Sequence, residues 1–360
     1  MQVTLYRDHP AEGWPSMDRY AESLSAALQQ LATPGWEFKM PMPPPPWPGR
    51  YGQILRRSLG YRAWVRQEQG NVNHIIDHSY GHLLLTLDPA RTVVTVHDVT
   101  PMRFPGYQFG LSQLAWRLAW RGVQRAQHVI VVSSFVAAEL EGCLKLAAPH
   151  IFVVPEGVSP HFCPQPAERQ AAVRSRYLLE GQRLVLHLGH THPRKNLPTL
   201  LRALALLRQQ GIAFAFVQIG GRPNESHKKL IRELGLEQAV HFVGRVSDMD
   251  LVALYSTAAV FVFPSLYEGF GLPVLEAMAC GTPVVASNAA SLPEVVGEAG
   301  LLLDPNSPLA LAEAIAQVLD DHALAAELRQ RGLERARQST WEQTARGCLN
   351  VYRHIGEKDR

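Results

Sequence analysis

The chain has 360 residues, a length typical of about two ordinary domains. Hydrophobic residues make up 46% of the sequence and charged residues 19%, which excludes an intrinsically disordered chain and allows a large core. The formal net charge of +3 is too small to indicate nucleic-acid binding.

The cysteines and the N-terminal residues indicate a reducing, aqueous setting. No Cys-x-x-Cys pair is present, so the sequence indicates neither a zinc knuckle nor a disulfide framework for Cys143, Cys163, Cys280 and Cys348. The first residues lack the basic-then-apolar pattern of a signal peptide. No uninterrupted apolar run reaches the roughly 20 residues that a membrane span needs. We therefore expect a cytoplasmic protein, soluble or peripheral at the inner membrane face.

Short apolar runs alternate with longer amphipathic stretches along the chain. The runs predict strands at Thr92–Val96, Val129–Val132, Ile151–Val154, Leu184–Leu188, Ala215–Ile219, Val240–Val243, Val260–Phe263 and Pro283–Ala286. Helical periodicity is found at Leu197–Gln210, Glu225–Leu234, Asp250–Ala258 and Trp341–Ile355. Continuous apolar strands separated by helices are typical of parallel sheets that are covered on both faces. We therefore predict the α/β class, with doubly wound sheets.

Two irregular stretches interrupt this pattern. Pro41–Arg50 contains the run Pro43–Pro46 and is predicted to be an exposed loop, because proline fits neither a strand ladder nor a helix interior. Pro155–Ala167 is rich in proline and glycine and marks the predicted domain boundary. We expect an N-terminal domain at 1–160, a second domain at 161–340, and a C-terminal helix at 341–360 that packs back on the first domain. No G-x-G-x-x-G follows the first strand and no Walker A sequence is present, which argues against a dehydrogenase and an ATPase.

Two segments of the first half combine arginine with aromatic residues. Arg50–Arg66 carries arginine at positions 50, 56, 57, 62 and 66 amid tyrosine and tryptophan, and Leu111–Gln127 carries Trp116 and Trp120 with further arginines. Basic amphipathic helices with tryptophan bind anionic membranes, and such contact would place the protein at a membrane surface. The alternative is a solvated basic face above a stripe of core residues. The sequence leaves both interpretations open.

Arg194-Lys195-Asn196 follows a predicted strand and precedes a predicted helix that begins near Pro198. Positive side chains are unfavourable at a helix N-terminus, so two in succession suggest that an anion lies between them. The alternative is a solvated basic loop. His187, His190 and His192 lie nearby, but no carboxylate or cysteine accompanies them as a metal site would require. We expect His187 on the strand, and the sequence leaves open whether His190 and His192 line a ligand cleft.

Asp248-Met249-Asp250 has the D-x-D spacing that binds a metal ion in some enzymes. Ser247 and Asp250 are also spaced as a capping box at the start of a helix. We prefer the cap, and we expect no essential metal and no other cofactor.

The segment Phe263–Met278 joins a strand to a helix through a glycine-rich loop. Glycines let the backbone approach a ligand closely, and a helix N-terminus favours an anion such as a diphosphate. Pro273 is placed where a helix tolerates a missing N–H. Glu268 in the loop and Glu276, expected in the first helical turn, supply carboxylates for sugar or ribose hydroxyls. The alternative is that Glu276 only complements the helix dipole and Glu268 is a simple loop charge.

Taken together, these motifs resemble the retaining GT-B glycosyltransferases of family 4. Glu268 and Glu276, with seven residues between them, match the family's E-x7-E motif. Other matching residues in the second half are Arg194–Leu197, Phe242–Gly244, Glu268–Pro273, Cys280–Ala286, Leu292–Gly297 and Trp341–Glu342. The first half matches at Val96–Asp98, Ser133–Phe135 and Val154–Val158. It departs from the family at Glu156, where asparagine is usual, and around Gly13-Trp14, which has one glycine where many members have two.

The resemblance implies two Rossmann-like domains that face each other across a cleft, with the donor bound mainly by the second. Arg194 and Lys195 would neutralise the leaving diphosphate, and Glu276 would bind the ribose. The resemblance assigns the transferred sugar to Glu268 and the loop residues Gly269, Phe270 and Gly271, with Leu272 also on the donor side. It assigns the base to Asp248. It places His97 near the anomeric carbon. It also places Gly13 and Trp14 on the acceptor side.

The expected function is the metal-independent transfer of a hexose, with retention, from a nucleotide-diphosphate sugar to a glycan or lipid-linked acceptor. The stretch His97–Pro101 resembles bacterial mannosyltransferases of the family, which favours GDP-mannose over a UDP-sugar as donor. Two alternatives remain: a partner subunit that binds a nucleotide-sugar without turnover, and another GT-B enzyme such as a sugar-nucleotide epimerase or a phosphorylase.

Overall fold

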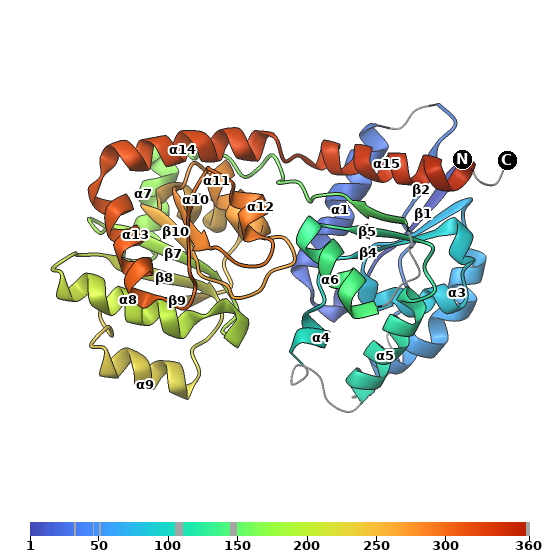
Figure 1. The fold of residues 1–360 in the computed structure, drawn as a ribbon, viewed down its shortest axis with the longest axis horizontal. Coiled ribbons are helices and arrows are strands. Elements are labelled where there is room, and N and C mark those ends of the chain that lie inside the picture. The colour runs from blue at the N-terminus through green and yellow to red at the C-terminus, as the bar shows by residue number, and fades with distance from the viewer. Residues whose placement is uncertain (32–33, 46, 50–51, 105–110, 145–149, 358–360) are drawn as a thin grey trace. The chain divides into compact units, whose positions relative to one another are not determined.

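The computed structural model describes residues 1–31, 34–45, 47–49, 52–104, 111–144 and 150–357. The chain divides into two compact units (Figure 1): unit 1 is Met1–Gly157 with Trp341–Arg360, and unit 2 is Val158–Thr340. Pro46, Arg50 and the side chain of Cys143, named above, lie outside the described residues, as does Tyr51 in the segment Arg50–Arg66. The chain passes between the units twice, and the backbone N–H of Val158 donates to the Ser339 carbonyl at 2.9 Å beside these two crossings.

Unit 1 is built on a parallel sheet with the strand order β2-β1-β3-β4-β5-β6. Its strands are β1 (Gln2–Tyr6), β2 (Glu37–Lys39), β3 (Val72–Ile75), β4 (Thr92–Val96), β5 (His128–Val131) and β6 (His150–Val153). Its helices are η1 (Pro10–Glu12), α1 (Pro15–Gln30), α2 (Gly52–Leu55), η2 (Arg56–Gly60), α3 (Tyr61–Gln67), η3 (His78–Leu85), η4 (Pro89–Arg91), α4 (Thr100–Arg103), α5 (Leu111–Val123), α6 (Ser134–Leu144) and α15 (Trp341–Glu357).

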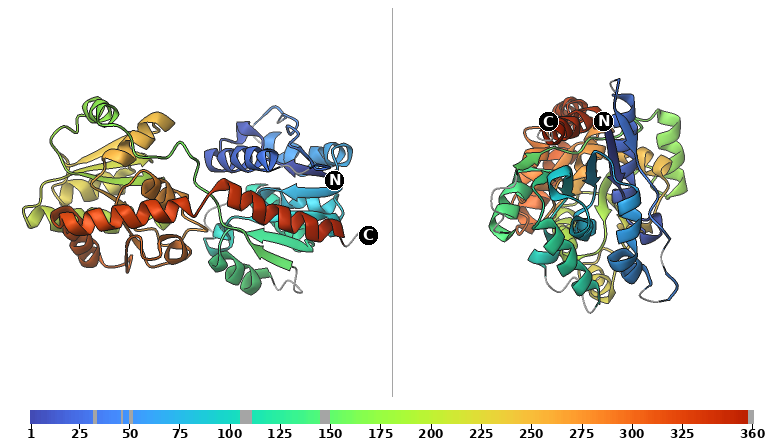
Figure 2. Two further views of the ribbon diagram at one scale, coloured as in Figure 1. Left: turned by 90° about the horizontal axis from the view of Figure 1, so that it is seen from above. Right: turned by 90° about the vertical axis from the view of Figure 1, so that its right-hand side faces the viewer.

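The C-terminal helix α15 completes the core of unit 1 (Figure 2). Its apolar face, which includes Trp341, Leu349 and Ile355, packs with Leu24 of α1 and Val3 of β1. Apolar residues at helical spacing give this face, and their burial supplies most of the helix's stability. Helix α15 therefore belongs to the same folded body as β1 and α1.

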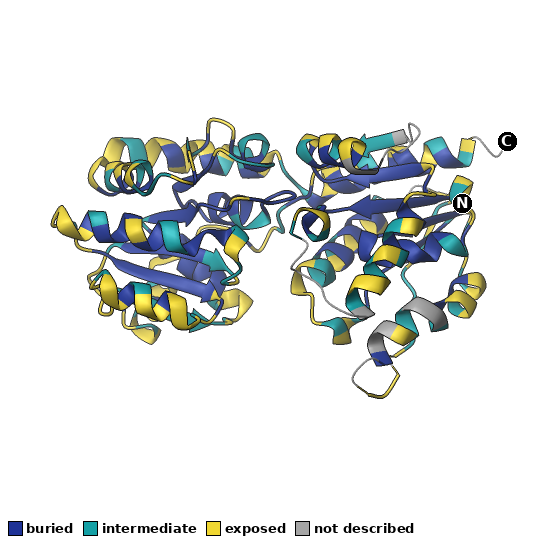
Figure 3. Cartoon of the chain, turned by 60° about the horizontal axis from the view of Figure 1, so that its bottom comes forward, coloured by how far each residue is buried: buried dark blue, intermediate teal, exposed yellow. Residues whose placement is uncertain are grey.

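Unit 2 is built on a second parallel sheet with the order β12-β11-β10-β7-β8-β9. Its strands are β7 (Leu184–Gly189), β8 (Ala215–Gly220), β9 (Val240–Gly244), β10 (Val260–Phe263), β11 (Val284–Ser287) and β12 (Leu301–Leu303). Its helices are α7 (Ala167–Arg176), η6 (Pro193–Lys195), α8 (Leu197–Gln209), α9 (Glu225–Glu233), α10 (Asp248–Thr257), α11 (Leu272–Ala279), α12 (Leu292–Val296), α13 (Pro308–Asp320) and α14 (His322–Arg337). Figure 3 shows the central strands of both sheets as buried.

Every strand that the apolar runs predict is present, and each end lies within one residue of its predicted position. The runs did not predict β1, β2, β3 and β12. Pro41–Pro45 and Trp47–Gly49 form a loop as expected, but Pro43 within it is buried and not exposed. The predicted helix Leu111–Gln127 ends earlier, at Val123.

The order of the strands reverses at one point in each sheet. In unit 1 this switch point lies between β1 and β3, and in unit 2 between β7 and β10. Open parallel sheets bind ligands outside the carboxyl ends of the strands at such a switch point. The segments that follow these four strands are therefore the first places to look for a site.

Candidate active site

Two basic side chains meet one carboxylate at the switch point of unit 2. Arg194 Nη1 lies 2.7 Å from Glu268 Oε2, and Lys195 Nζ lies 2.6 Å from Glu268 Oε1. Arg194 also donates to the carbonyl of Tyr267 at 3.1 Å. Lys195 and Glu268 are 7% and 8% exposed, and Arg194 is half-buried. Residues that the sequence places near two separate helix starts therefore form one charge cluster.

The η6 turn fixes the direction of these cations. The His192 side chain accepts the N–H of Arg194, and Asn196 ends the turn with a φ of 56°. The Asn196 side-chain amide then donates to the carbonyls of Pro264 and Pro305, at 3.2 and 2.6 Å. Asparagine suits both tasks, because it tolerates left-handed backbone and carries two side-chain donors. This residue ties the loop after β7 to the loop after β10.

Lys195 is confined on several sides. Its ammonium lies 4.5 Å from the centre of the Phe263 ring, and a Cβ added at Gly189 would approach Lys195 Cε to 3.1 Å. Burial alone would raise the pKa of Glu268, but the charges of Lys195 and Arg194 outweigh burial and hold that pKa at about 2. Two cations beside one carboxylate leave a net positive charge at the carboxyl edge of the sheet. The anion of a ligand would balance that charge.

The glycine-rich loop continues from Glu268 into α11. Gly271 has a φ of 122°, and a Cβ there would lie 2.8 Å from a leucine side chain of α12, so only glycine fits. Ser291 Oγ lies 2.9 Å from the Glu268 carbonyl oxygen and 2.6 Å from the Phe270 carbonyl oxygen, and its single proton, donated between these two acceptors, helps to fix the loop backbone. Pro273 lies in the first turn of α11, as predicted. The loop thus brings a helix N-terminus, which favours anions, next in sequence to the cationic cluster.

Glu276 is the fifth residue of α11, one position beyond the first turn in which it was expected. It is only 3% exposed, and its Oε2 accepts from the Tyr255 hydroxyl of α10 at 3.2 Å. The Thr282 hydroxyl in turn donates to the Tyr255 carbonyl at 2.5 Å. A carboxylate that only complemented the helix dipole would lie in the first turn and exposed. Burial and a place beyond the first turn therefore distinguish Glu276 from a carboxylate that only complements the helix dipole.

Asp248 is exposed at the start of α10. Ser247 caps this helix as predicted, its hydroxyl accepting the N–H of Asp250 at 3.1 Å. The second half of the predicted capping box is wrong, since the Asp250 carboxylate pairs with Arg176 at 2.6 Å and accepts from the Tyr177 hydroxyl at 3.2 Å. This carboxylate therefore braces α10 against α7.

The three histidines near the cations have different surroundings. His187 lies on β7 as predicted, is buried, and directs Nδ1 to the Val262 carbonyl at 2.8 Å; burial lowers its pKa to about 4. His192 caps η6, and His190 is exposed. Within the described part of the chain, no group of three or more His, Cys, Asp or Glu residues is arranged to hold a metal ion.

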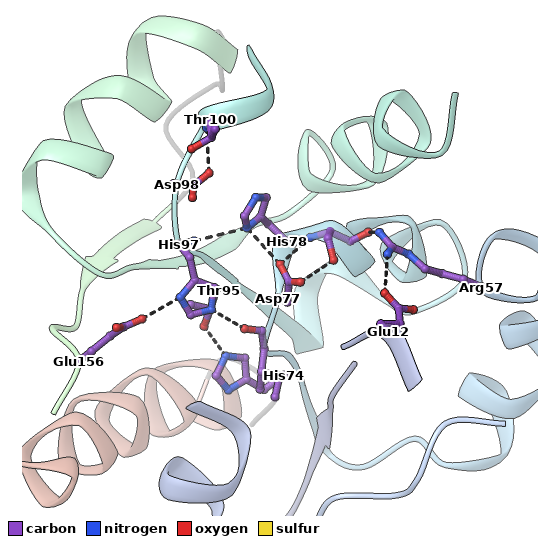
Figure 4. Close-up of polar contacts among 12 residues, drawn as sticks. Glu12, Arg57, His74, Asp77, His78, Thr95, His97, Asp98, Thr100 and Glu156 are labelled. Carbon is purple, nitrogen blue, oxygen red and sulfur yellow. Dashed lines mark hydrogen bonds and ion pairs between the residues drawn. The ribbon is translucent and has the colours of Figure 1, made fainter. Parts of the chain in front are cut away.

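In unit 1, His97 directly follows β4 at the carboxyl edge of the sheet (Figure 4). It is 8% exposed. Its Nδ1 lies 2.9 Å from Glu156 Oε1, and its Nε2 lies 2.8 Å from the Ile76 carbonyl oxygen. The residue that departs from the family pattern is thus the direct partner of the predicted acceptor-side histidine.

Sequence reasoning missed an acidic pair at the switch point of unit 1. Asp8 follows β1 and Asp77 follows β3, and both are buried. Burial and the charge of Asp77 raise the pKa of Asp8 well above its ordinary value. Although burial opposes it, His78 and hydrogen bonds to Asp8 and Ser79 lower the pKa of Asp77 to about 2. The signal was present in the sequence, because each aspartate follows a short run containing valine and isoleucine or leucine.

Arg57 corrects the expectation of a solvated or membrane-facing basic segment at that position. Its guanidinium pairs with Glu12 at 3.1 Å, donates to the Ser79 carbonyl and lies 4.5 Å from the centre of the Tyr80 ring. Tyr80 also donates to Glu12 at 2.5 Å. Arg57 is therefore part of the buried polar framework behind Asp8.

Two other predicted features of unit 1 lie at the ends of its helices. Gly13 ends η1 with a φ of 72°, and Trp14 precedes α1 with 49% of its surface exposed. In α5, Trp116 and Trp120 pack on His78, with ring centres 5.3 and 5.5 Å away. These tryptophans thus belong to the core stripe. No helix among the described residues combines the length and apolar character needed to cross a membrane.

Comparison with known proteins places both halves of the chain in one family. Residues 169–338 match the family model of glycosyl transferases group 1, and residues 2–162 match that of glycosyltransferase family 4. The O-antigen chain mannosyltransferase B of Escherichia coli is 35% identical over 267 residues, which cover 73% of this chain and 70% of that protein. The serotype-specific mannosyltransferase WbdA of Escherichia coli is 30% identical over 282 residues, 74% of this chain, but the match spans only 34% of that longer protein.

The structure of the chain is also similar to that of a known protein. The sucrose-phosphate synthase structure from Thermosynechococcus elongatus superposes with a TM-score of 0.78, at 24% identity and over 99% of both chains. This similarity extends over the two doubly wound units and agrees with the GT-B fold predicted from the motifs. The chain therefore belongs to the group 1, family 4 glycosyltransferases and is a mannosyltransferase-like enzyme of the GT-B fold.

Proposed function

We propose that this enzyme transfers a hexose, with retention of configuration, from a nucleotide-diphosphate sugar to a hydroxyl of a glycan or lipid-linked acceptor. Unit 2 would bind the donor and unit 1 the acceptor. The observation that carries the proposal is the cluster of Arg194, Lys195 and Glu268, which keeps a net positive charge beside the glycine loop and the start of α11. A diphosphate fits such a site in charge and in hydrogen-bond acceptors.

Each donor group has a proposed partner. Arg194 and Lys195 would bind the diphosphate, and Glu276 would accept hydrogen bonds from the ribose hydroxyls. Glu268 would bind the transferred sugar with the loop residues Gly269, Phe270, Gly271 and Leu272. Asp248, exposed at the start of α10, would contact the base.

The proposed reaction needs no dedicated base. The bond between the anomeric carbon and the diphosphate oxygen breaks, and the acceptor oxygen bonds to the same face of that carbon. The acceptor proton passes to the departing diphosphate. Arg194 and Lys195 stabilise the charge that develops on the diphosphate, which is the largest charge formed in the reaction. These cations supply what a metal supplies elsewhere, so we propose that no metal or other cofactor is required.

We propose mannose as the sugar and GDP-mannose as the donor, with a UDP-sugar as the alternative. The support is that the two relatives described above are named mannosyltransferases. The name of the first also mentions an O-antigen chain, which supports a glycan as acceptor.

Transfer by the purified protein tests this proposal. With GDP-mannose and a mannosylated acceptor, we expect an α-linked product in the presence of EDTA at the same rate as with added Mg²⁺. The measurement is the initial rate, with the anomeric configuration of the product determined by NMR. An inverted product would contradict retention, and a loss of activity in EDTA that Mg²⁺ restores would contradict metal independence.

The same assay separates the two alternative functions. A partner subunit that only binds would be stabilised by the nucleotide-sugar but would neither transfer nor hydrolyse it. An epimerase would convert the donor without any acceptor. Acceptor-dependent release of nucleoside diphosphate is expected from a transferase alone.

We further propose a cytoplasmic enzyme that contacts the inner membrane face through α5. Leu114 on this helix is 62% exposed, and Arg117 and Arg121 beside it are exposed as well. At low salt the protein should sediment with anionic liposomes but not with neutral ones, and the charge reversal R117E/R121E should abolish this binding. A matched reversal of the exposed Arg331 in unit 2 should have no effect. Failure of the wild-type protein to sediment would contradict the membrane contact.

A further inference from the structure

Both ring nitrogens of His97 face hydrogen-bond acceptors (Figure 4). The Ile76 carbonyl oxygen, 2.8 Å from Nε2, carries no proton, so Nε2 must donate. The Glu156 carboxylate lies 2.9 Å from Nδ1, and an ionised carboxylate can only accept. A neutral imidazole has one N–H and can satisfy only one of these two partners. Both hydrogen bonds form only when the imidazole ring carries a proton on each nitrogen.

The surroundings favour that cationic form. Burial alone would lower the pKa of His97, but the hydrogen bond and charge of Glu156, the charge of Asp77 and the Ile76 carbonyl raise it above its ordinary value. Among the described residues, further titratable groups beside the ring are His74 on β3, Tyr20 on α1 and His78 at the start of η3. Burial lowers the pKa of both His74 and His78, so neither adds a competing positive charge at neutral pH.

We propose that Glu156 is a positioning residue that keeps His97 protonated on both ring nitrogens, so that His97 serves the transfer reaction as a fixed cation and not as a proton acceptor. The participation of His97 in transfer rests on the proposed function. Its protonation does not, because that follows from contacts within unit 1.

Two consequences follow for the reaction. The His97 ring has no free lone pair, so it cannot deprotonate the acceptor hydroxyl, and the proton must leave by another route such as the departing diphosphate. The ring is also held in one orientation by two hydrogen bonds from opposite nitrogens, one to the segment after β6 and one to the segment after β3. A charge fixed in this way needs no reorganisation when negative charge develops nearby.

The substitution E156Q tests the proposal with little change of shape. The glutamine amide can donate to an unprotonated Nδ1 while Nε2–H still binds the Ile76 carbonyl, so the variant accommodates a neutral ring. The matched control is E139Q, which neutralises another buried carboxylate of unit 1, the partner of Arg103. Substitution H97N identifies the His97 resonances by their disappearance.

The direct measurement is an NMR titration of ¹⁵N-histidine-labelled protein. In the wild type and in E139Q, both His97 nitrogens should show imidazolium shifts through pH 7, above the ordinary histidine pKa of about 6.5. In E156Q, His97 should be neutral at pH 7. A single protonated nitrogen in the wild type at pH 7, or the same titration in E156Q, would overturn the proposal. This readout needs no catalysis, so an inactive protein whose His97 titrates as expected would contradict the proposed function and not this inference.

The pH dependence of transfer provides the second readout. The kcat of the wild type should not fall as the pH passes the ordinary histidine pKa of about 6.5, because His97 keeps its proton there. In E156Q, kcat should fall about tenfold per pH unit above the lowered pKa and recover at acid pH, with little change in KM. A purely structural role for Glu156 would instead reduce kcat equally at every pH.

Discussion

Replacement of Lys195 by alanine should lower kcat/KM for transfer by about 10³-fold. Lys195 is a buried, pre-positioned donor to the leaving diphosphate, and removal of one such group typically reduces the rate by about 10²–10³-fold. The ion pair of Arg194 with Glu268 remains in this variant, so the buried carboxylate keeps one partner. The measurement is the initial rate over a range of donor concentrations, together with thermal unfolding.

The control for this variant is K228A, which removes an exposed lysine of α9 whose partner Glu225 is also exposed. Solvent screens such an exposed pair, so K228A should have wild-type activity and stability. If K195A retained more than about a tenth of wild-type activity while still folded, Lys195 would not be the diphosphate ligand.

Substitution of Glu276 by glutamine should weaken binding of a nucleoside diphosphate by about 10–100-fold and leave binding of inorganic pyrophosphate unchanged. The carboxylate would accept hydrogen bonds from the ribose, and hydrogen bonds to a charged group contribute about 1.5–3 kcal/mol. Pyrophosphate has no ribose, so it reports only on the cationic cluster. Isothermal titration with the two ligands measures both affinities.

The variant Y255F provides the matched control for Glu276. It removes the hydroxyl that donates to Glu276 Oε2 but keeps the carboxylate, so its effect on nucleoside diphosphate binding should be smaller than that of E276Q. Equal loss of pyrophosphate and nucleoside diphosphate binding in E276Q would show that Glu276 supports the loop and does not bind the ribose.

The strands that the sequence predicted are dominated by apolar residues and carry at most isolated polar ones, as in Val260–Phe263 and Leu184–Leu188. Strand β3 was missed because Asn73 and His74 are polar, although both are buried. His74 is satisfied by the Tyr352 hydroxyl at 2.6 Å and the Thr95 hydroxyl at 2.7 Å. Tyr352 lies on the last helix, so no local pattern could show that this position is buried.

The donor side could be predicted because its residues are concentrated in two short motifs. The structure adds that Arg194 and Lys195 share Glu268, a contact across more than 70 residues of sequence that spacing alone cannot give. On the acceptor side, Glu156 could be seen only as a departure from the family pattern. Its partner His97 lies 59 residues earlier in the chain. Arg57 was misassigned for the same reason, since its partner Glu12 is 45 residues away.

The central claim is that Arg194 and Lys195 bind the second phosphate of the donor. The most direct measurement compares the affinities of GDP and GMP, or of UDP and UMP, for the wild type and K195A. We expect the wild type to bind the diphosphate at least about tenfold more tightly than the monophosphate, a difference of about 1.4 kcal/mol, and K195A to lose most of that preference. An undiminished preference in K195A would contradict the account.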